Sequence, residues 1–287
     1  MRLILKFGGS SLSSIKKIKE VAQFISNLKK RKNLELIIVV SAMGKTTNML
    51  ESLANKFDCC KLSSTYGALL TIGENISNYL LCMALEELNI NAVSLTCKDI
   101  KITASGSVDF GIITHIDKTK IENYLLENKV VIVSGFQGEN SHGQIITLGR
   151  GGSDTTAVAL GHTLNANVKI YTDVNGFYSV NPAQYQNAKL LKNIYIKSAI
   201  ELANVNAKVL DYRALCLLNQ NKTPLTVAKS LSNNSTTVSF KPVENYQIDG
   251  ISCKNKISFV KNTIKYSHFL QTINQNLNYK NYFYNTY

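Results

Sequence analysis

A glycine-rich segment at residues 147–157 combines residue types that handle anions. It holds three glycines, Arg150 and Asp154, and it stands between a short apolar run and a helical pattern that begins at Ser153. Glycine lets backbone N–H groups approach an anion closely, and the N-terminus of the following helix adds partial positive charge. Arginine can bind a carboxylate or a phosphate through two parallel hydrogen bonds. The segment therefore predicts an anion-binding site.

A second polar group follows the first apolar run of the chain. Lys6 stands at the end of this run, and Gly8, Gly9 and Ser10 come directly after it. A lysine, two glycines and a hydroxyl at the start of a helix suit the oxygens of a phosphate. A Gly-Gly turn before a helix is common in any fold, but a lysine that ends a buried strand is not. We therefore interpret the group as a phosphate site.

Four further polar residues each allow two interpretations. Glu74 lies on a mainly apolar helix, where it could bind an ammonium group or face the solvent. Thr172 and Asp173 follow an apolar run, so Asp173 could accept a hydrogen bond from a ribose or base on which Tyr178 stacks. The same residues could instead form a capped Asn-Gly turn. The residues themselves leave these alternatives open.

Two familiar nucleotide-binding motifs are incomplete in this chain. The segment 44–46 resembles the end of a phosphate-binding P-loop, but Val39 occupies the position where that motif requires glycine. The segment 149–154 departs from the dinucleotide pattern because Asp154 replaces its last glycine. Ser41 and Thr46 of the first segment stay available to a polar ligand.

Composition places the chain among ordinary folded proteins. It has 287 residues, 45% hydrophobic and 18% charged, with a net charge of +13. Such a charge could attract a polyanion, but the lysines are scattered and form no basic stripe with interleaved aromatics, so we expect no specific nucleic-acid partner. No apolar run approaches the length of a membrane span, and the N-terminus lacks a signal segment. We expect a cytoplasmic protein that makes no membrane contact.

The cysteines and histidines do not predict a metal centre. The six cysteines form no Cys-x-x-Cys pair, and the four histidines are far apart in the sequence. We therefore expect no transition-metal site. The cysteines are more typical of reduced, mostly buried small hydrophobic residues.

Apolar runs alternate with helical periodicity along most of the chain. Short continuous apolar strands separated by helices favour a mostly parallel sheet, covered by helices on both faces, in a three-layer αβα sandwich. Such sheets bind ligands at the carboxyl ends of their strands. We expect strands at 2–7, 36–40, 92–95, 130–133, 168–171 and 225–227, with one or two more between 248 and 260. We expect helices at 15–28, 46–57, 65–88, 121–127, 153–164, 196–202 and 208–219.

Taken together, the motifs resemble those of aspartokinases, which belong to the amino acid kinase family. The matching blocks are 6–10, 40–47, 73–74, 135–136, 147–157, 172–173 and 207–210, and they occur in the family's order over roughly the first 240 residues. The block at 147–157 separates the chain from acetylglutamate, uridylate, glutamate and carbamate kinases. An ordered series of blocks is far more specific than any single motif.

The resemblance implies an ATP-dependent kinase. Aspartokinases transfer the γ-phosphoryl group of MgATP to the side-chain carboxylate of L-aspartate, giving 4-phospho-L-aspartate, the first step toward lysine, threonine, methionine and diaminopimelate. Magnesium is expected to bind mainly through ATP. A kinase for another small carboxylate, or a catalytically weak or inactive binding subunit of the same fold, stays open.

The resemblance also implies roles for individual residues. Lys6 and Asp154 are the expected catalytic residues. The expected aspartate contacts are Ser41, Thr46, Glu74, Phe136 and Arg150. The expected nucleotide contacts are Lys6, Gly8, Gly9, Ser10, Ser153, Thr172, Asp173, Tyr178 and Lys208.

The chain departs from the family pattern in three ways, of which Asp211-Tyr212, where relatives often have His-Pro, carries little weight because that position is variable. Asn181-Pro182-Ala183 stands where relatives often have Asp-Pro-Arg, so we expect weaker nucleotide binding with activity retained. Residues 248–252 resemble the opening of a regulatory ACT module, of which aspartokinases usually carry two. We therefore expect a catalytic domain at 1–243, a short ACT-like remnant at 244–287 and no ACT-mediated feedback. ACT pairs form the usual dimer, which leaves a homodimer open here.

Overall fold

The protein is described by a computed structural model. It covers residues 1–31, 33–57, 63–205, 209–230, 232, 234–242, 248–254 and 257–262, the last two ranges by their backbone alone. Lys208 lies outside these ranges, as does most of the segment 244–287 that we assign to a separate tail. The predictions made for Lys208 and for the tail's division from the rest therefore stay predictions.

A large sheet forms the middle layer of the fold. It has eight strands in the order β10-β12-β11-β9-β1-β2-β6-β3. The pairing is parallel from β11 through β9, β1, β2 and β6 to β3, and antiparallel between β11 and β12. The bounds are β1 (Arg2–Phe7), β2 (Glu35–Val40), β3 (Ala92–Leu95), β6 (Val130–Ser134), β9 (Asn167–Thr172), β10 (Asn193–Tyr195), β11 (Leu225–Lys229) and β12 (Ser235–Ser239).

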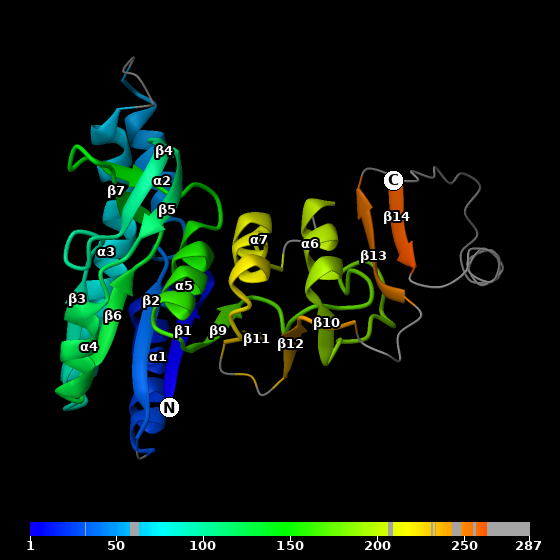
Figure 1. The fold of residues 1–287 in the computed structure, drawn as a ribbon, viewed down its shortest axis with the longest axis horizontal. Helices are drawn as coiled ribbons and strands as arrows, with labels where there is room; N and C mark the ends of the chain where they lie inside the picture. Colours follow the sequence, from blue (N-terminus) through cyan, green and yellow to red (C-terminus); the bar gives the residue numbers. More distant parts are fainter. Residues whose placement is uncertain are drawn as a thin grey trace.

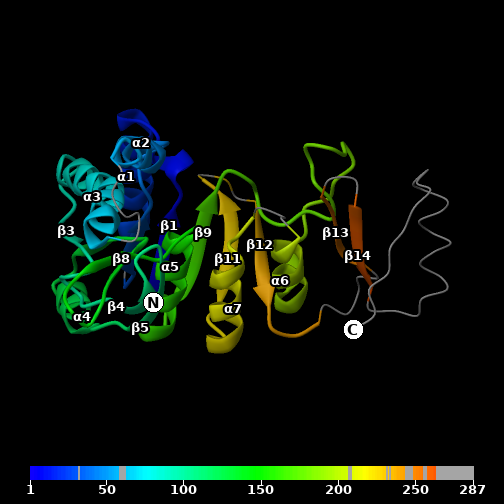
Figure 2. The ribbon, with the colours of Figure 1, turned by 90° about the horizontal axis from the view of Figure 1, so that it is seen from above.

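Helices cover both faces of this sheet, which confirms the three-layer αβα sandwich (Figures 1 and 2). One face packs against α1 and α3, and the other packs mainly against α5 and α7. The helices are α1 (Ile15–Lys29), α2 (Thr46–Ala54), α3 (Ser64–Glu86), α4 (Thr119–Leu126), α5 (Gly152–Thr163), α6 (Ile196–Asn204) and α7 (Tyr212–Asn221), and a short 3₁₀ helix η1 (Gly9–Leu12) follows β1.

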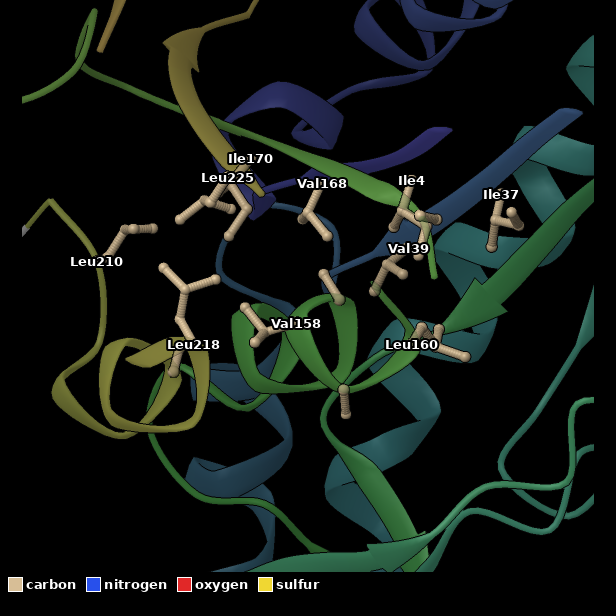
Figure 3. Close-up of a cluster of buried hydrophobic side chains, with 14 of the residues drawn as sticks. Ile4, Ile37, Val39, Val158, Leu160, Val168, Ile170, Leu210, Leu218 and Leu225 are labelled. Carbon is tan, nitrogen blue, oxygen red and sulfur yellow. The ribbon is translucent and has the colours of Figure 1, made fainter. Parts of the chain in front are cut away.

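The alternation of side chains along β1 decides what each face of the sheet receives. Leu5 and Phe7 are fully buried on the face of α1 and α3, whereas Ile4 is buried in the cluster with α5. Figure 3 shows Ile4 with Val39, Val158 and Val168 in that second cluster. Because successive side chains of a strand point to opposite faces, Lys6 shares the side of Ile4 and α5.

A second, four-stranded sheet was not predicted from the sequence. It has the order β5-β4-β7-β8 and consists of β4 (Thr103–Ser107), β5 (Phe110–His115), β7 (Gln137–Glu139) and β8 (Ile145–Thr147). Its strands are short, and much of β4 and β5 is exposed. Such strands carry few buried apolar side chains and give little signal in the sequence. Farther along the chain, β13 (Ile248–Lys254) and β14 (Ile257–Asn262) form an antiparallel hairpin.

Two sequence predictions need correction at element ends. Helix α2 ends at Ala54 and not at 57, and α7 begins at Tyr212 and not at 208. The later start has a local cause: the Asp211 side chain accepts a hydrogen bond from the backbone N–H of Arg213 and caps the helix. In addition, no strand was expected between 227 and 248, but β12 lies there and adds to the sheet beside β11.

Helix α3 is long and apolar enough to cross a membrane by length and composition. Much of it is nevertheless buried within the protein, with Leu70, Leu81 and Leu85 turned inward. Asn78 also ties it to the central sheet, since its side-chain amide donates to the Leu95 carbonyl and the Ser134 hydroxyl, both at 2.9 Å. It is a core helix of a folded domain.

Candidate active site

The strands β1, β2, β6 and β9 are parallel, so the turns that follow them all lie at the carboxyl-terminal ends of the strands, along one side of the central sheet. A cavity of about 230 Å³ opens at this edge, which is smaller than the roughly 300–1,000 Å³ typical of pockets for drug-sized ligands. It therefore fits a small metabolite. Its lining consists of Lys6, Gly9, Ser41, Ala42, Gly44, Thr47, Asn48, Glu74, Phe136 and residues 149–154.

A buried ion pair forms the floor of the cavity. Lys6 reaches from β1 to Asp154 in the first turn of α5, with 2.7 Å between Lys6 Nζ and Asp154 Oδ1. Both residues are less than one-tenth exposed. A buried ammonium group needs a partner of opposite charge, and Asp154 supplies it while leaving other N–H donors of Lys6 for a ligand. Lys6 can therefore bind an anionic ligand while it stays paired with the Asp154 carboxylate.

Glu74 faces the cavity from α3 and is only 4% exposed, which rules out the alternative of a solvated residue. One carboxylate oxygen accepts a hydrogen bond of 3.0 Å from the Ala42 backbone N–H. The other, Oε2, is buried and has no hydrogen-bond partner among the described residues. Burial raises the pKa of Glu74 to about 7, although the Ala42 amide and the Lys6 ammonium group lower it in part. A buried carboxylate oxygen without a donor is suited to receive a cationic ligand group.

Two helices begin at the cavity. The first turn of α5 brings Ser153 and Asp154 to its wall, and the first turn of α2 brings Thr47 and Asn48. Neither helix has a hydrogen-bonding side-chain cap. Several of the first N–H groups donate within their own turn, such as Gly152 to Gly149 and Asp154 to Gly151, but the partial positive charge of each helix N-terminus still favours an anion. Thr46 itself is not on the lining, because its hydroxyl turns back to donate to the Met43 carbonyl at 2.6 Å.

Phe136 is held in an uncommon backbone conformation at the cavity wall. Its φ of 70° lies in the left-handed region that bulky residues rarely adopt. Two hydrogen bonds fix it there: its N–H donates to the Thr156 hydroxyl at 3.2 Å, and its carbonyl accepts from the Leu148 N–H at 2.8 Å. Backbone strain of this kind costs on the order of 1–3 kcal/mol and is often found at functional sites.

The glycines next to the cavity serve packing as well as ligand approach. A Cβ at Gly9 would stand 2.7 Å from the Ala42 carbonyl oxygen, so the loop after β2 can rest on the loop after β1. At Gly8 a Cβ would stand 3.6 Å from Lys6 Nζ, in space that a ligand of the lysine can use. Ser10, in contrast, is exposed and not on the lining.

Of the residues expected to contact nucleotide, Lys6, Gly9 and Ser153 line the cavity, whereas Thr172, Asp173 and Tyr178 lie beyond it, at the end of β9 and just after it. Thr172 ends this strand, and its hydroxyl donates to the exposed Asp173 carboxylate at 3.0 Å. The Tyr178 hydroxyl accepts a hydrogen bond of 3.2 Å from the Asn175 side chain. The Gly8 N–H donates to the Tyr171 carbonyl at 3.2 Å and so joins the phosphate loop to this edge. Among the described residues no strands pair across Asn175-Gly176, so the segment is a loop and the Asn-Gly turn does not close a hairpin.

The substituted loop at 181–183 keeps its turn. The Asn181 side-chain oxygen accepts a hydrogen bond of 3.0 Å from the Ala183 N–H. An aspartate oxygen in this position could accept the same bond, so Asn181 preserves the local structure. What the chain lacks at this loop is the cation that relatives often carry at position 183.

Several residues at the site were not found from the sequence. Thr47 and Asn48 line the cavity, and Ala42 supplies the amide that orients Glu74. Asp211 and Arg213 pack behind the glycine-rich loop. The motif block at 40–47 pointed to the neighbourhood of the first three, but nothing local pointed to Asp211 and Arg213, which meet the loop only in the folded chain.

An edge of this kind, where cationic and amide donors gather at the carboxyl ends of parallel strands, is typical of α/β proteins that bind phosphorylated small molecules. The chain belongs to the amino acid kinase family, whose sequence profile matches residues 1–229. This membership confirms the family and fold expected from the motifs.

Known relatives narrow the likeness further. The chain is 38% identical to the aspartokinase of Bacillus sp. (strain MGA3) over 262 residues, which is 90% of this chain and 64% of that protein. The crystal structure of aspartate kinase from Synechocystis is 36% identical with a TM-score of 0.73, and the match covers 86% of this chain and 41% of that one. The chain thus spans less than two thirds of each of these relatives.

A more distant solved structure supports the fold alone. It is E. coli aspartokinase III in complex with aspartate and ADP, with 21% identity and a TM-score of 0.75. The match covers 88% of this chain and 67% of that chain.

Proposed function

We propose that this chain is an aspartate kinase that transfers the γ-phosphoryl group of ATP to the side-chain carboxylate of L-aspartate. The observation that carries the proposal is one small cavity that holds both the Lys6–Asp154 ion pair and the unpartnered Oε2 of Glu74. Such a cavity offers a site for an anion and a site for an ammonium group a short distance apart. An amino acid with a second carboxylate fits this pattern, and the similarity to aspartokinases favours aspartate.

The proposed roles follow from these positions. Glu74 receives the substrate ammonium group, and Arg150 binds a substrate carboxylate, assisted by Ser41 and the N-terminus of α2. The reacting carboxylate oxygen attacks the γ-phosphorus, and the bond from this phosphorus to the oxygen of the leaving ADP breaks. No proton needs to move, because the nucleophile is already ionised. Catalysis then rests on position and charge, and Lys6 neutralises the oxygens of the transferring group.

In this proposal the nucleotide binds next to the cavity, at the carboxyl-terminal end of β9, and we call this region the nucleotide edge. Thr172, Asp173 and Tyr178 contact its ribose and base, and Gly8 and Gly9 lie along the phosphates. The described residues contain no group of three His, Cys, Asp or Glu side chains that could hold a metal ion. In this proposal Mg²⁺ would bind mainly through ATP, whose phosphate charge it would neutralise. We also propose that the enzyme works in the cytoplasm, in amino-acid biosynthesis.

The test is ATP turnover with and without L-aspartate, with the acyl phosphate trapped by hydroxylamine. We expect aspartate-dependent acyl hydroxamate from the wild-type chain and none from Lys6→Ala. Lys120→Ala is the matched control, because Lys120 forms an exposed ion pair with Asp99 at 2.8 Å. If acyl hydroxamate forms only with another carboxylate, that compound replaces aspartate as the proposed acceptor. If the protein folds and binds ATP but forms no product, it is a binding subunit and not a kinase.

A homodimer stays a prediction. A surface that bears on it is the outer face of α3, where Ile72, Ile76, Tyr79 and Met83 are 42%, 39%, 51% and 62% exposed. This spacing puts the four side chains on one side of the helix. The mass of the chain in solution, measured by light scattering, decides the matter.

A further inference from the structure

Three segments that are far apart in the sequence meet behind the glycine-rich loop. They are the turn between β4 and β5, the loop at 147–152 and the first turn of α7. Phe110 is the first residue of β5, directly after the turn; the loop contributes the backbone of Arg150, and α7 contributes Arg213. None of these contacts faces the cavity.

Arg213 connects the three segments. Its guanidinium carbon lies 4.1 Å from the centre of the Phe110 ring. Its Nη2 donates a hydrogen bond of 2.6 Å to the Arg150 carbonyl oxygen. Its Nε lies 3.5 Å from Asp211 Oδ1, which also accepts from the Arg213 backbone N–H at 3.0 Å. A guanidinium group can stack and donate in its plane at the same time, whereas an ammonium group cannot do so with fixed geometry.

The glycines of the loop make this contact possible. A Cβ at Gly149 would stand 2.9 Å from Arg213 Nη2, and one at Gly151 would stand 2.1 Å from the Asp211 Cβ. Both glycines have a φ of 67°. The sequence analysis explained these glycines by close approach to an anion. The structure adds that they let the start of α7 lie directly against the loop.

The Arg150 side chain belongs to the loop that Arg213 contacts. It is exposed at the cavity, and its guanidinium group makes no hydrogen bond or ion pair with the described residues. Its position without ligand is therefore set by its backbone, and Arg213 binds that backbone at the carbonyl of the same residue. Backbone anchoring reduces the conformational freedom that a ligand would otherwise have to remove.

We propose that Arg213 is a positioning residue that holds Arg150 ready for the carboxylate of the acceptor, with Phe110 as the platform on which it stacks. This inference rests on the proposed function, because it concerns the acceptor site. Arg213 does not touch the substrate in this arrangement. It acts on acceptor binding through the loop and leaves the nucleotide edge beside β9 unchanged.

The kinetic test compares Arg213→Ala, Arg213→Lys and the control Arg31→Ala, an exposed arginine of the segment after α1. We expect Arg213→Ala to raise KM for L-aspartate about tenfold with KM for ATP within about twofold, Arg213→Lys to recover part of the loss, and Arg31→Ala to match wild type. In an Arg150→Ala background, Arg213→Ala should cause no further rise. Equal rises in both KM values, or additive effects of the two variants, would overturn the proposal.

A second measurement needs no activity. The Gly152 N–H donates to the Gly149 carbonyl at 3.0 Å, and the Asp154 N–H donates to the Gly151 carbonyl at 2.9 Å. Hydrogen exchange at these amides should be faster in Arg213→Ala and unchanged in Arg31→Ala. Unchanged exchange in Arg213→Ala overturns the proposal. Faster exchange in a chain that does not phosphorylate aspartate upholds the contact with the loop and overturns only the assigned acceptor. Arg213→Lys carries the test if Arg213→Ala does not fold.

Discussion

The cavity and the nucleotide edge beside β9 differ in how fully the fold prepares them. In the cavity, Lys6, Asp154 and Glu74 are buried, and packed loops fix their positions. At the nucleotide edge, Asp173 is exposed and Thr172 and Tyr178 are partly exposed, and their polar groups bond to near neighbours in the sequence. The proposed acceptor side is thus built before substrate arrives, whereas the proposed nucleotide side presents groups along an open edge. Substitutions in the cavity should have the larger effects.

The largest effect is expected from Asp154→Asn. The substitution removes the negative charge that balances the buried Lys6. The lysine then loses the partner that orients it, and its positive charge is left buried without an opposite charge. We expect kcat to fall about a thousandfold, the upper end of the loss that follows when one preorganised hydrogen-bond donor is removed from an active site. The hydroxamate assay measures it. Asp99→Asn, which breaks an exposed pair with Lys120, should leave kcat unchanged. A decrease in kcat of less than tenfold in Asp154→Asn would contradict the view that the fold fixes the charges of the cavity before substrate binds.

Glu74→Gln should come next. Loss of the charge that receives the ammonium group should raise KM for aspartate about a hundredfold. Because the pKa of Glu74 is raised to about 7, kcat/KM for aspartate in the wild-type chain should rise with pH until Glu74 is ionised. The profile should be flat through this range in Glu74→Gln. Glu86→Gln, an exposed substitution on the same helix, should keep the wild-type profile.

The same group predicts how stability depends on pH. The folded chain keeps the Glu74 proton up to a pH of about 7, whereas the ordinary value for glutamate is 4.5. Between these values the folded state binds more protons at this site than the unfolded state, so its contribution to the free energy of unfolding falls as pH rises. Denaturant titrations of the wild-type chain and Glu74→Gln at several pH values isolate this contribution. No difference in slope between the two would show that Glu74 ionises normally.

The two sheets differ in how well their strands could be predicted from the sequence. The parallel strands could be predicted because β1, β2 and β6 are continuous apolar runs, which only a sheet covered on both faces can bury. The strands β4 and β5 could not, because they are exposed and their residues follow no consistent alternation. A strand is recognised in a sequence by its buried apolar side chains, and β4 and β5 have few of them.

For the site, residue types and their order were sufficient to bring Lys6, Glu74 and Arg150 into one hypothesis. The sequence does not contain the unpartnered Oε2 of Glu74, because that depends on α3 packing against the loop of Ala42. Arg213 was missed for a similar reason, since its contact with Arg150 joins residues 63 positions apart. Local patterns carry no information about such contacts.

Gly151→Ala tests whether the close fit of α7 against the glycine-rich loop contributes to the stability of the fold. The new Cβ would collide with Asp211, in addition to the cost of an alanine at a φ of 67°. We expect the free energy of unfolding to fall by about 2 kcal/mol, measured by denaturant titration. Gly143→Ala is a matched control, because Gly143 has a φ of 74° but only the Glu139 side chain nearby. It should lose about 1 kcal/mol. Equal losses would show that the loop has room to spare.

The smallest effect is expected at the nucleotide edge, from Ala183→Arg. Asn181 already preserves the turn, so the substitution adds a cation without rebuilding the loop. The loop is exposed, and an exposed ionic contact contributes only about 0.2–1 kcal/mol, so KM for ATP should fall about threefold while KM for aspartate stays the same.

Gln184→Arg places the same charge one position farther along the exposed loop and should have little effect on either substrate. Equal ATP affinities in the wild-type chain and Ala183→Arg would mean that the missing cation costs nothing, and the predicted weakness of nucleotide binding would be wrong. A gain much larger than threefold would instead mean that the edge beside β9 closes around ATP more tightly than its exposed residues suggest. The contrast with the cavity would then describe only the chain without its nucleotide.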